Sequence, residues 1–120
     1  MTLIANVLTG LVALAHVGIL VLEMFLWDHP VGRRIFAMTP EVSASSKVLA
    51  MNQGLYNGFL AAGLVWGLIA ADPTGHDAQV FFLCCVVVAG VYGSVTANRR
   101  ILFAQALPGA LALAAVLLAG

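Results

Sequence analysis

The stretch Met51–Ala62, with the sequence MNQGLYNGFLAA, decides how the rest of this chain is read. It places Asn52, Gln53, Tyr56 and Asn57 within an apolar run that is otherwise typical of a membrane span. Polar side chains are costly in hydrocarbon because no water satisfies their hydrogen bonds. Four of them together indicate partners on other helices, a cavity or a ligand.

The composition around this stretch is far more apolar than that of a soluble domain. Of 120 residues, 62% are hydrophobic and 8% are charged, and the mean hydropathy is +1.06. Soluble domains average roughly 25% charged residues. The composition therefore predicts an all-α integral membrane protein with a single domain over residues 1–120. At about 20 residues per span, the apolar runs predict a four-helix bundle with helices at about 3–27, 45–71, 79–97 and 101–119.

Local signals refine these helix ends. The first run continues past Ala13-Leu14-Ala15 without a basic segment before it, so we expect a membrane span and not a cleaved signal peptide. Thr39-Pro40-Glu41 combines a capping residue, a first-turn proline and an early acid, which predicts a helix start near Pro40. Asn98-Arg99-Arg100 predicts a tight connection before the last helix, and Pro108 predicts a kink within it.

The charges predict an orientation. The second connection carries only Asp72, His76 and Asp77, whereas all basic residues lie in the first and third connections or at their edges. Cytoplasmic loops carry an excess of basic residues. We therefore expect both termini on the non-cytoplasmic side of a bacterial inner membrane. The basic residues are Arg33, Arg34, Lys47, Arg99 and Arg100.

Small residues four apart predict how the helices pack, because such seams let helix backbones approach closely in lipid. Four short helices also enclose little interior, so we expect self-association into a homo-oligomer. The predicted seams are Gly54, Gly58 and Ala62 on the second helix, Ala89, Gly93 and Ala97 on the third, and Ala106, Ala110 and Ala114 on the fourth.

Counting about 1.5 Å per residue from the cytoplasmic helix ends puts several polar residues at similar depths. Glu23 and Asn52 share a level, and His16 and Asn57 share a deeper one. We expect a polar pocket in the cytoplasmic half, with Glu23 and His16 as candidate catalytic acid or base. The candidate ligand-binding residues are Asn52, Gln53, Tyr56, Asn57, Tyr92 and Gln105.

Each of these residues also has a structural interpretation. Glu23 can reach the lipid headgroups or pair with Arg33 or Arg34. His16 can be a neutral, hydrogen-bonded core residue, and the amides can simply join helices. The partners we expect are membrane lipid and a small lipophilic ligand. No nucleotide-binding glycine loop, metal-ligand spacing or nucleophile elbow is present, so we expect no cofactor, metal or nucleic acid.

Four segments resemble one family of small bacterial membrane proteins, domain of unknown function 1304. They are Leu22–Trp27 (LEMFLW), Gly32–Phe36 (GRRIF), Asn52–Phe59 (NQGLYNGF) and Ala89–Gly93 (AGVYG). The resemblance covers nearly the whole chain, and it implies a membrane protein without implying an activity.

Two weaker resemblances suggest functions. Arg33-Arg34-x-Phe36, followed by a helix rich in Asn and Tyr, is similar to the membrane-associated eicosanoid and glutathione metabolism proteins, which implies a four-helix trimer. A chain of this length with Glu23 in its first helix also resembles the small multidrug transporters, which implies proton-coupled export. The leading hypothesis is binding or conversion of a small lipophilic molecule, and the rivals are export and a purely structural bundle.

Overall fold

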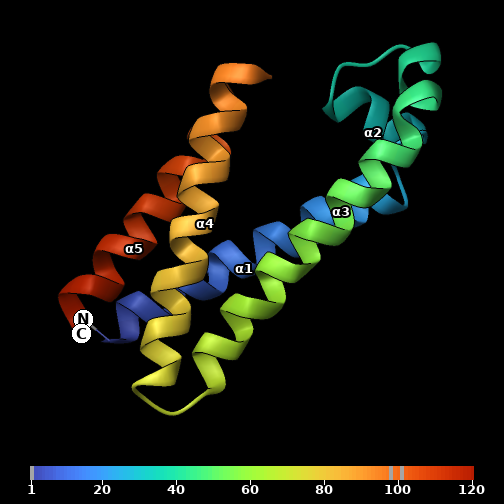
Figure 1. Cartoon of the computed structure of the whole chain (residues 1–120). Coiled ribbons are helices and arrows are strands. Elements are labelled where there is room, and N and C mark those ends of the chain that lie inside the picture. Colours follow the sequence, from blue (N-terminus) through green and yellow to red (C-terminus); the bar gives the residue numbers. More distant parts are fainter. Residues whose placement is uncertain (1, 98, 101) are drawn as a thin grey trace. The chain divides into compact units, whose positions relative to one another are not determined.

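The computed structural model describes residues 2–97, 99–100 and 102–120, and every regular element in them is a helix. The all-α class is therefore confirmed. The elements are α1 (Thr2–Met24), α2 (Pro30–Ile35), α3 (Pro40–Ile69), α4 (Thr74–Thr96), the π-helix η1 (Leu102–Ala106) and α5 (Leu107–Ala119), shown in Figure 1.

The chain divides into two compact units. Unit 1 contains the chain up to Leu14 together with Leu60–Gly120, and unit 2 contains Ala15–Phe59. Two of the long helices contribute to both units, since α1 and α3 each cross a boundary between them. The single domain predicted from the composition stays a prediction.

The helix ends follow the capping signals more closely than the hydropathy. Helix α3 begins at Pro40, where the sequence predicts it, and Thr39 Oγ1 accepts a hydrogen bond from Val42 N–H at 3.3 Å. Helix α4 begins at Thr74, earlier than the predicted residue 79. Its first turn is polar, and hydropathy therefore leaves this turn outside the apolar run although the backbone is already helical.

The last helix is irregular before its proline. Pro108 is the second residue of α5, and η1 directly precedes that helix. Because proline lacks an N–H, a carbonyl in the preceding turn has no helical donor, and a π-turn is one way to accommodate this. Of the predicted connection Asn98-Arg99-Arg100, Asn98 lies outside the described residues, as does Ile101, the predicted start of the last helix.

The core of unit 1 lies between α4, α5 and the adjoining ends of α1 and α3. Leu64, Leu83 and Val86 are fully buried in it. Helix α4 approaches η1 so closely that a Cβ added at Gly90 would lie 2.7 Å from the backbone nitrogen of Ala106. Gly109 of α5 is similarly close to α4, since its added Cβ would lie 2.8 Å from Val86 Cγ1.

Most members of the predicted seams on the third and fourth helices do not pack within this chain; Ala106 is the exception, because it is buried against Gly90. Ala89, Ala110 and Ala114 are exposed, whereas Gly90 and Gly109 are buried. Small residues occur on several faces of these helices. Spacing alone does not select the face that packs.

Unit 2 confirms Gly54 and Gly58 as the packing residues of the second predicted helix. A Cβ added at Gly54 would lie 3.1 Å from Glu23 Cβ, and one at Gly58 would lie 2.7 Å from Leu20 Cδ1. Small residues at these positions thus let α3 lie against the second half of α1. The predicted third member, Ala62, is exposed.

The first connection is structured, which the sequence did not predict. Helix α2 is capped by His29, whose Nδ1 accepts a hydrogen bond from Val31 N–H at 3.2 Å. After it, Met38 N–H donates to Arg33 O at 2.8 Å, and Ala37 has the left-handed φ of 52°. This is a Schellman-type helix end with alanine where glycine is usual.

Helices α1 and α4 are long and apolar enough to cross a membrane by length and composition. The apolar helix Phe103–Ala119 is shorter, and α3 carries Asn52, Gln53 and Asn57 among its apolar residues. The four-helix membrane bundle and the position of its termini stay predictions.

Candidate functional site

The structure brings together two of the predicted site residues in unit 2. Asn57 Nδ2 donates a hydrogen bond to Glu23 Oε1, and both side chains are half-buried. Counting from helix ends had put Glu23 level with Asn52. The register differs because α1 ends at Met24, before the Trp27 from which the depth was counted, and because Gly54 packs against this part of α1.

The other predicted residues of unit 2 differ in their exposure. In unit 2, His16 is buried at 2% exposure, whereas Asn52, Gln53 and Tyr56 are exposed. Among residues 2–97, 99–100 and 102–120, the side chains of those three exposed residues form no hydrogen bond with one another. Their predicted role in ligand binding and that of His16 in catalysis stay predictions.

Two further predicted residues lie in unit 1. Tyr92 is 70% exposed on α4, and Gln105 Nε2 in η1 donates to Val86 O at 3.3 Å. Gln105 therefore joins η1 to α4, and the ligand-binding roles of Tyr92 and Gln105 stay predictions.

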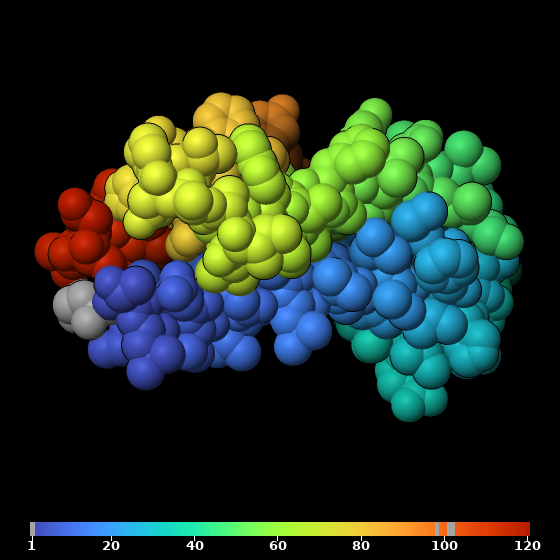
Figure 2. All heavy atoms as spheres, turned by 90° about the horizontal axis from the view of Figure 1, so that it is seen from below, coloured from blue at the N-terminus to red at the C-terminus, as the bar shows by residue number. Residues whose placement is uncertain are grey.

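Unit 1 contains a cavity of about 340 Å³ that the sequence did not predict. It lies where the start of α1, the end of α3, the first turns of α4 and the end of α5 come together. Figure 2 shows this end of unit 1 from below, with the start of α1 in dark blue, the α3–α4 turn in yellow-green and the end of α5 in red. The lining residues are Thr2, Ala5, Asn6, Gly67, Leu68, Ala70, Ala71, Asp72, His76, Gln79, Val116, Ala119 and Gly120.

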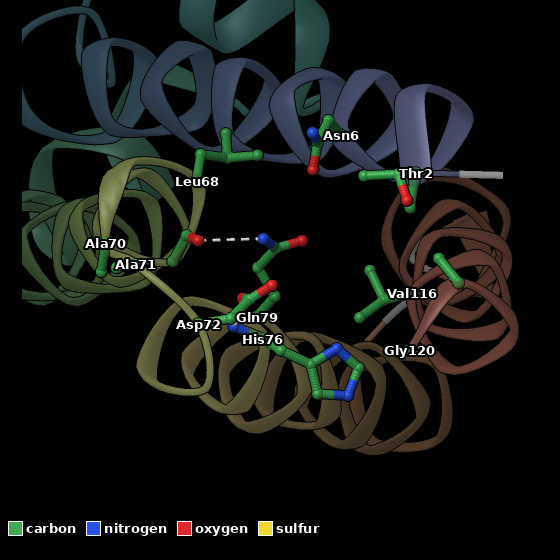
Figure 3. A pocket seen from close by; sticks show the side chains of 13 residues that line it. Thr2, Asn6, Leu68, Ala70, Ala71, Asp72, His76, Gln79, Val116 and Gly120 are labelled. Atoms are coloured by element: carbon green, nitrogen blue, oxygen red, sulfur yellow. Dashed lines mark hydrogen bonds between the residues drawn. The ribbon is translucent and has the colours of Figure 1, made fainter.

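Gln79 is the fixed polar group of this cavity. It is 8% exposed, and its side chain extends toward the middle of the cavity (Figure 3). Its Nε2 donates to Gly67 O at 2.9 Å, and its Oε1 accepts from Thr9 Oγ1 at 3.3 Å. An amide has a second N–H and a further lone pair. Gln79 can therefore offer one donor and one acceptor to a bound molecule from a fixed position.

Asp72 and His76 form the polar wall at the start of α4. Asp72 Oδ1 accepts a hydrogen bond from His76 N–H at 3.1 Å, which satisfies one of the free donors of that helix end. The His76 imidazole lies beside the end of α5, since a Cβ at Gly120 would be 2.6 Å from His76 Nδ1. Asn6 faces the cavity from α1 on the side opposite His76 (Figure 3).

The lining thus combines a polar group of side chains with apolar surface. Leu68, Val116 and Ala119 provide the apolar part. The lining is more polar than apolar, and the cavity volume lies within the range of about 300–1,000 Å³ that is usual for small-molecule sites. This arrangement suits a molecule with a polar head and a short apolar body.

A sequence signal for this site existed. Asp72, His76 and Gln79 are spaced as i, i+4 and i+7, which places the last two on one face of a helix. Sequence reasoning took Asp72 and His76 only as charges of a connection. The predicted site lay instead around the polar stretch of the second predicted helix.

A second polar cluster lies in unit 2, around the first predicted connection. Ser43 Oγ donates to Asp28 Oδ1 at 2.6 Å, and Arg33 forms an ion pair with the same carboxylate at 3.2 Å. The hydrogen bond from Ser43, followed by Arg33, lowers the pKa of Asp28. Trp27 Nε1 also donates to Ser46 Oγ at 2.9 Å. These bonds hold the first connection against the start of α3.

Metal binding finds no support in the part of the chain that the structure describes, because no three His, Cys, Asp or Glu side chains lie close enough there to share an ion. The expectation of no metal stays a prediction.

Comparisons with known proteins agree with the main sequence resemblance. The model of the family "Protein of unknown function (DUF1304)" matches residues 10–117. The chain is also 33% identical to the uncharacterized protein YpaA of Lactococcus lactis subsp. lactis (strain IL1403), over 98% of this chain and 97% of that protein. No solved structure matches. The resemblance to the eicosanoid and glutathione metabolism proteins stays a prediction. The chain belongs to the DUF1304 family.

Proposed function

We propose that this protein is a multi-pass membrane protein that binds a small amphiphilic molecule in the cavity of unit 1. The observation that carries the proposal is the cavity of about 340 Å³ around the buried amide of Gln79. The Gln79 amide keeps one donor and one acceptor for a bound molecule beside its bonds to Gly67 O and Thr9 Oγ1.

The exposed apolar surface of the helices supports the membrane part of the proposal. In the most apolar 18-residue windows of α1 and α4, 28% of the residues are buried inside the protein. The core helix of a soluble protein would be mostly buried, whereas these helices expose Leu3, Leu14 and Val88 by 66% to 75%. Extensive apolar surface of this kind is rare in soluble monomers, and lipid would cover it.

The proposed orientation determines on which side of the membrane the cavity lies. With Arg99 and Arg100 in the cytoplasm, the start of α4 faces the other side of a bacterial inner membrane. Both termini would then be non-cytoplasmic, and a ligand would enter from that surface or from the outer leaflet. Four spanning helices and self-association into a homo-oligomer belong to the same proposal.

The test uses three probes with the same eight-carbon chain: octanol, octylammonium and octanoate. The protein is placed in nanodiscs of zwitterionic lipid, and thermal unfolding is followed by circular dichroism. A probe at ten times its Kd should stabilise the protein by about 1.4 kcal/mol. The proposal requires that at least one probe does so.

A cavity-filling variant separates binding in the cavity from partitioning into lipid. Ala119→Leu adds volume to the lining, whereas Ala114→Leu adds the same side chain at an exposed position of α5 outside the cavity. The stabilisation should persist in Ala114→Leu and disappear in Ala119→Leu. An equal response of the two variants, or no response to any probe, would overturn the proposal.

A second candidate function is proton-coupled export, favoured by the hydrogen bond between Asn57 and the half-buried Glu23 in unit 2. Glu23→Gln should then abolish resistance to a lipophilic cation in growing cells, whereas Glu41→Gln, at an exposed position, should not. Unchanged resistance in Glu23→Gln would exclude export through this carboxyl.

A further inference from the structure

The charges around the cavity of unit 1 distinguish between classes of ligand head. Asp72 is the one Asp, Glu, Lys or Arg among the lining residues. Its Oδ1 accepts the backbone N–H of His76, and among the described residues its Oδ2 accepts no hydrogen bond. Asp72 is exposed, so this carboxylate oxygen is open to water or to a donor on a bound molecule.

Among the described residues of unit 1, no Lys or Arg lies close to this carboxylate. Arg99 and Arg100 follow the far end of α4, whose 23 residues span about 34 Å. That distance is several times the Debye length of about 8 Å at physiological salt, so the two arginine charges are screened from Asp72. Among the described Asp, Glu, Lys and Arg side chains of unit 1, Asp72 and Asp77 therefore lie at this end of α4, and the His76 imidazole lines the cavity beside them.

The neutral groups complete a set that can accept hydrogen bonds. Gln79 Oε1 keeps a lone pair beside the bond from Thr9. The carbonyls of Gly67 and Ala70 lie at the end of α3, close to the start of α4, because a Cβ at Gly75 would meet both. Helix C-terminal carbonyls carry partial negative charge and favour cations.

We infer that the cavity selects amphiphiles with a primary or secondary ammonium head, whose N–H groups bond to Asp72 and Gln79 while the apolar body lies against Leu68, Val116 and Ala119. This inference rests on the proposed function and specifies its ligand class. A carboxylate or phosphate head would face the Asp72 charge at short range, which is unfavourable.

The experiment compares the Kd values of octylammonium, octanol and octanoate for the full chain in zwitterionic nanodiscs near neutral pH. An alkylammonium is charged there, because its pKa resembles that of lysine. A charge-assisted hydrogen bond is roughly twice as strong as a neutral one. Octylammonium should therefore bind about tenfold more tightly than octanol, and octanoate should bind more weakly than octanol.

Two matched variants test the role of Asp72. Asp72→Asn removes the charge but keeps an oxygen that can accept from His76 N–H, and it should weaken octylammonium binding about tenfold with octanol unchanged. Asp77→Asn removes the same charge at an exposed position that does not line the cavity, and it should change binding less than twofold.

The outcomes separate this inference from the proposed function. Equal Kd values for the three probes, with binding lost in Ala119→Leu, would overturn the ammonium preference and leave cavity binding intact. An equal effect of Asp72→Asn and Asp77→Asn would also overturn it, because the attraction would then come from general surface charge. The absence of binding by all three probes would overturn both proposals.

Discussion

Replacing Gln79 by leucine should loosen unit 1 at the cavity. The amide joins three elements, because Nε2 donates to Gly67 O of α3 at 2.9 Å and Oε1 accepts from Thr9 Oγ1 of α1 at 3.3 Å. Leucine is of similar size but has no polar atoms. The substitution therefore removes both hydrogen bonds while it preserves most of the packing.

The expected loss follows from the groups left behind. Gly67 O lies in the last turn of α3, where carbonyls lack a helical donor, and a buried acceptor without a partner costs about 1–3 kcal/mol. The Thr9 hydroxyl, which is fully buried, adds about 0.6 kcal/mol, the average for hydrogen bonds between membrane helices. The free energy of unfolding should thus fall by about 2–3 kcal/mol.

Gln105→Leu is the matched control, because Gln105 also bonds a backbone carbonyl, that of Val86 at 3.3 Å. That carbonyl lies inside α4 and has a helical donor of its own, so the loss should stay below about 1 kcal/mol. Unfolding by SDS in mixed micelles, followed by circular dichroism, measures both variants. If Gln79→Leu is no more destabilising than Gln105→Leu, the assignment of Gln79 as a structural link at the cavity is wrong.

Three further substitutions test the packing and the polar connection. Gly90→Ala should destabilise the protein by about 1 kcal/mol, since overpacking against the η1 backbone costs about 1–3 kcal/mol and outweighs the better helix propensity of alanine. Gly18→Ala is the control and should stabilise by about 0.5–1 kcal/mol, because nothing lies within 4 Å of its added Cβ. Equal effects of the two substitutions on SDS unfolding would contradict the close approach of α4 and η1. Ala37→Gly should stabilise the protein by about 1 kcal/mol in the same assay, because Ala37 has a left-handed φ of 52° that glycine adopts without strain. A loss of stability would refute this interpretation of the end of α2. Because the pKa of Asp28 is lowered in the folded protein by the Ser43 hydrogen bond and by Arg33, its stabilising contribution is present above its ordinary value of 3.8 and is lost as the pH falls through the folded pKa. Asp28→Asn should therefore flatten the pH dependence of unfolding as the pH falls below about 4, and an unchanged profile would show that this cluster does not couple to stability.

Much of the fold could be predicted from local signals. Thr39-Pro40-Glu41 predicts the start of α3 because a cap and a first-turn proline act on the adjacent backbone alone. The seam at Gly54 and Gly58 was also predicted, since small residues there leave room for α1. The helical segment α2 was missed because its six residues contain Pro30 and Gly32, which indicate a loop when they are read one at a time.

The candidate site was predicted less well for a physical reason. Glu23 and Asn57 were both among the predicted site residues, but their hydrogen bond depends on the register of α1 against α3, which follows from packing at Gly54 and not from distance to a helix end. The cavity of unit 1 is built from segments far apart in the sequence. Gln79 and Asn6 line one cavity only because α1, α3, α4 and α5 come together in the folded chain.

The central claim is that the cavity of unit 1 binds an amphiphilic molecule, and photolabelling with a diazirine analogue of octanol tests it most directly. The protein in zwitterionic nanodiscs is illuminated, digested and sequenced by mass spectrometry. The account predicts labels on the segments 67–79 and 116–120, displaced by excess octanol and lost in Ala119→Leu. Labels spread over exposed apolar positions such as Leu3 and Val88, and unchanged in Ala119→Leu, would contradict it.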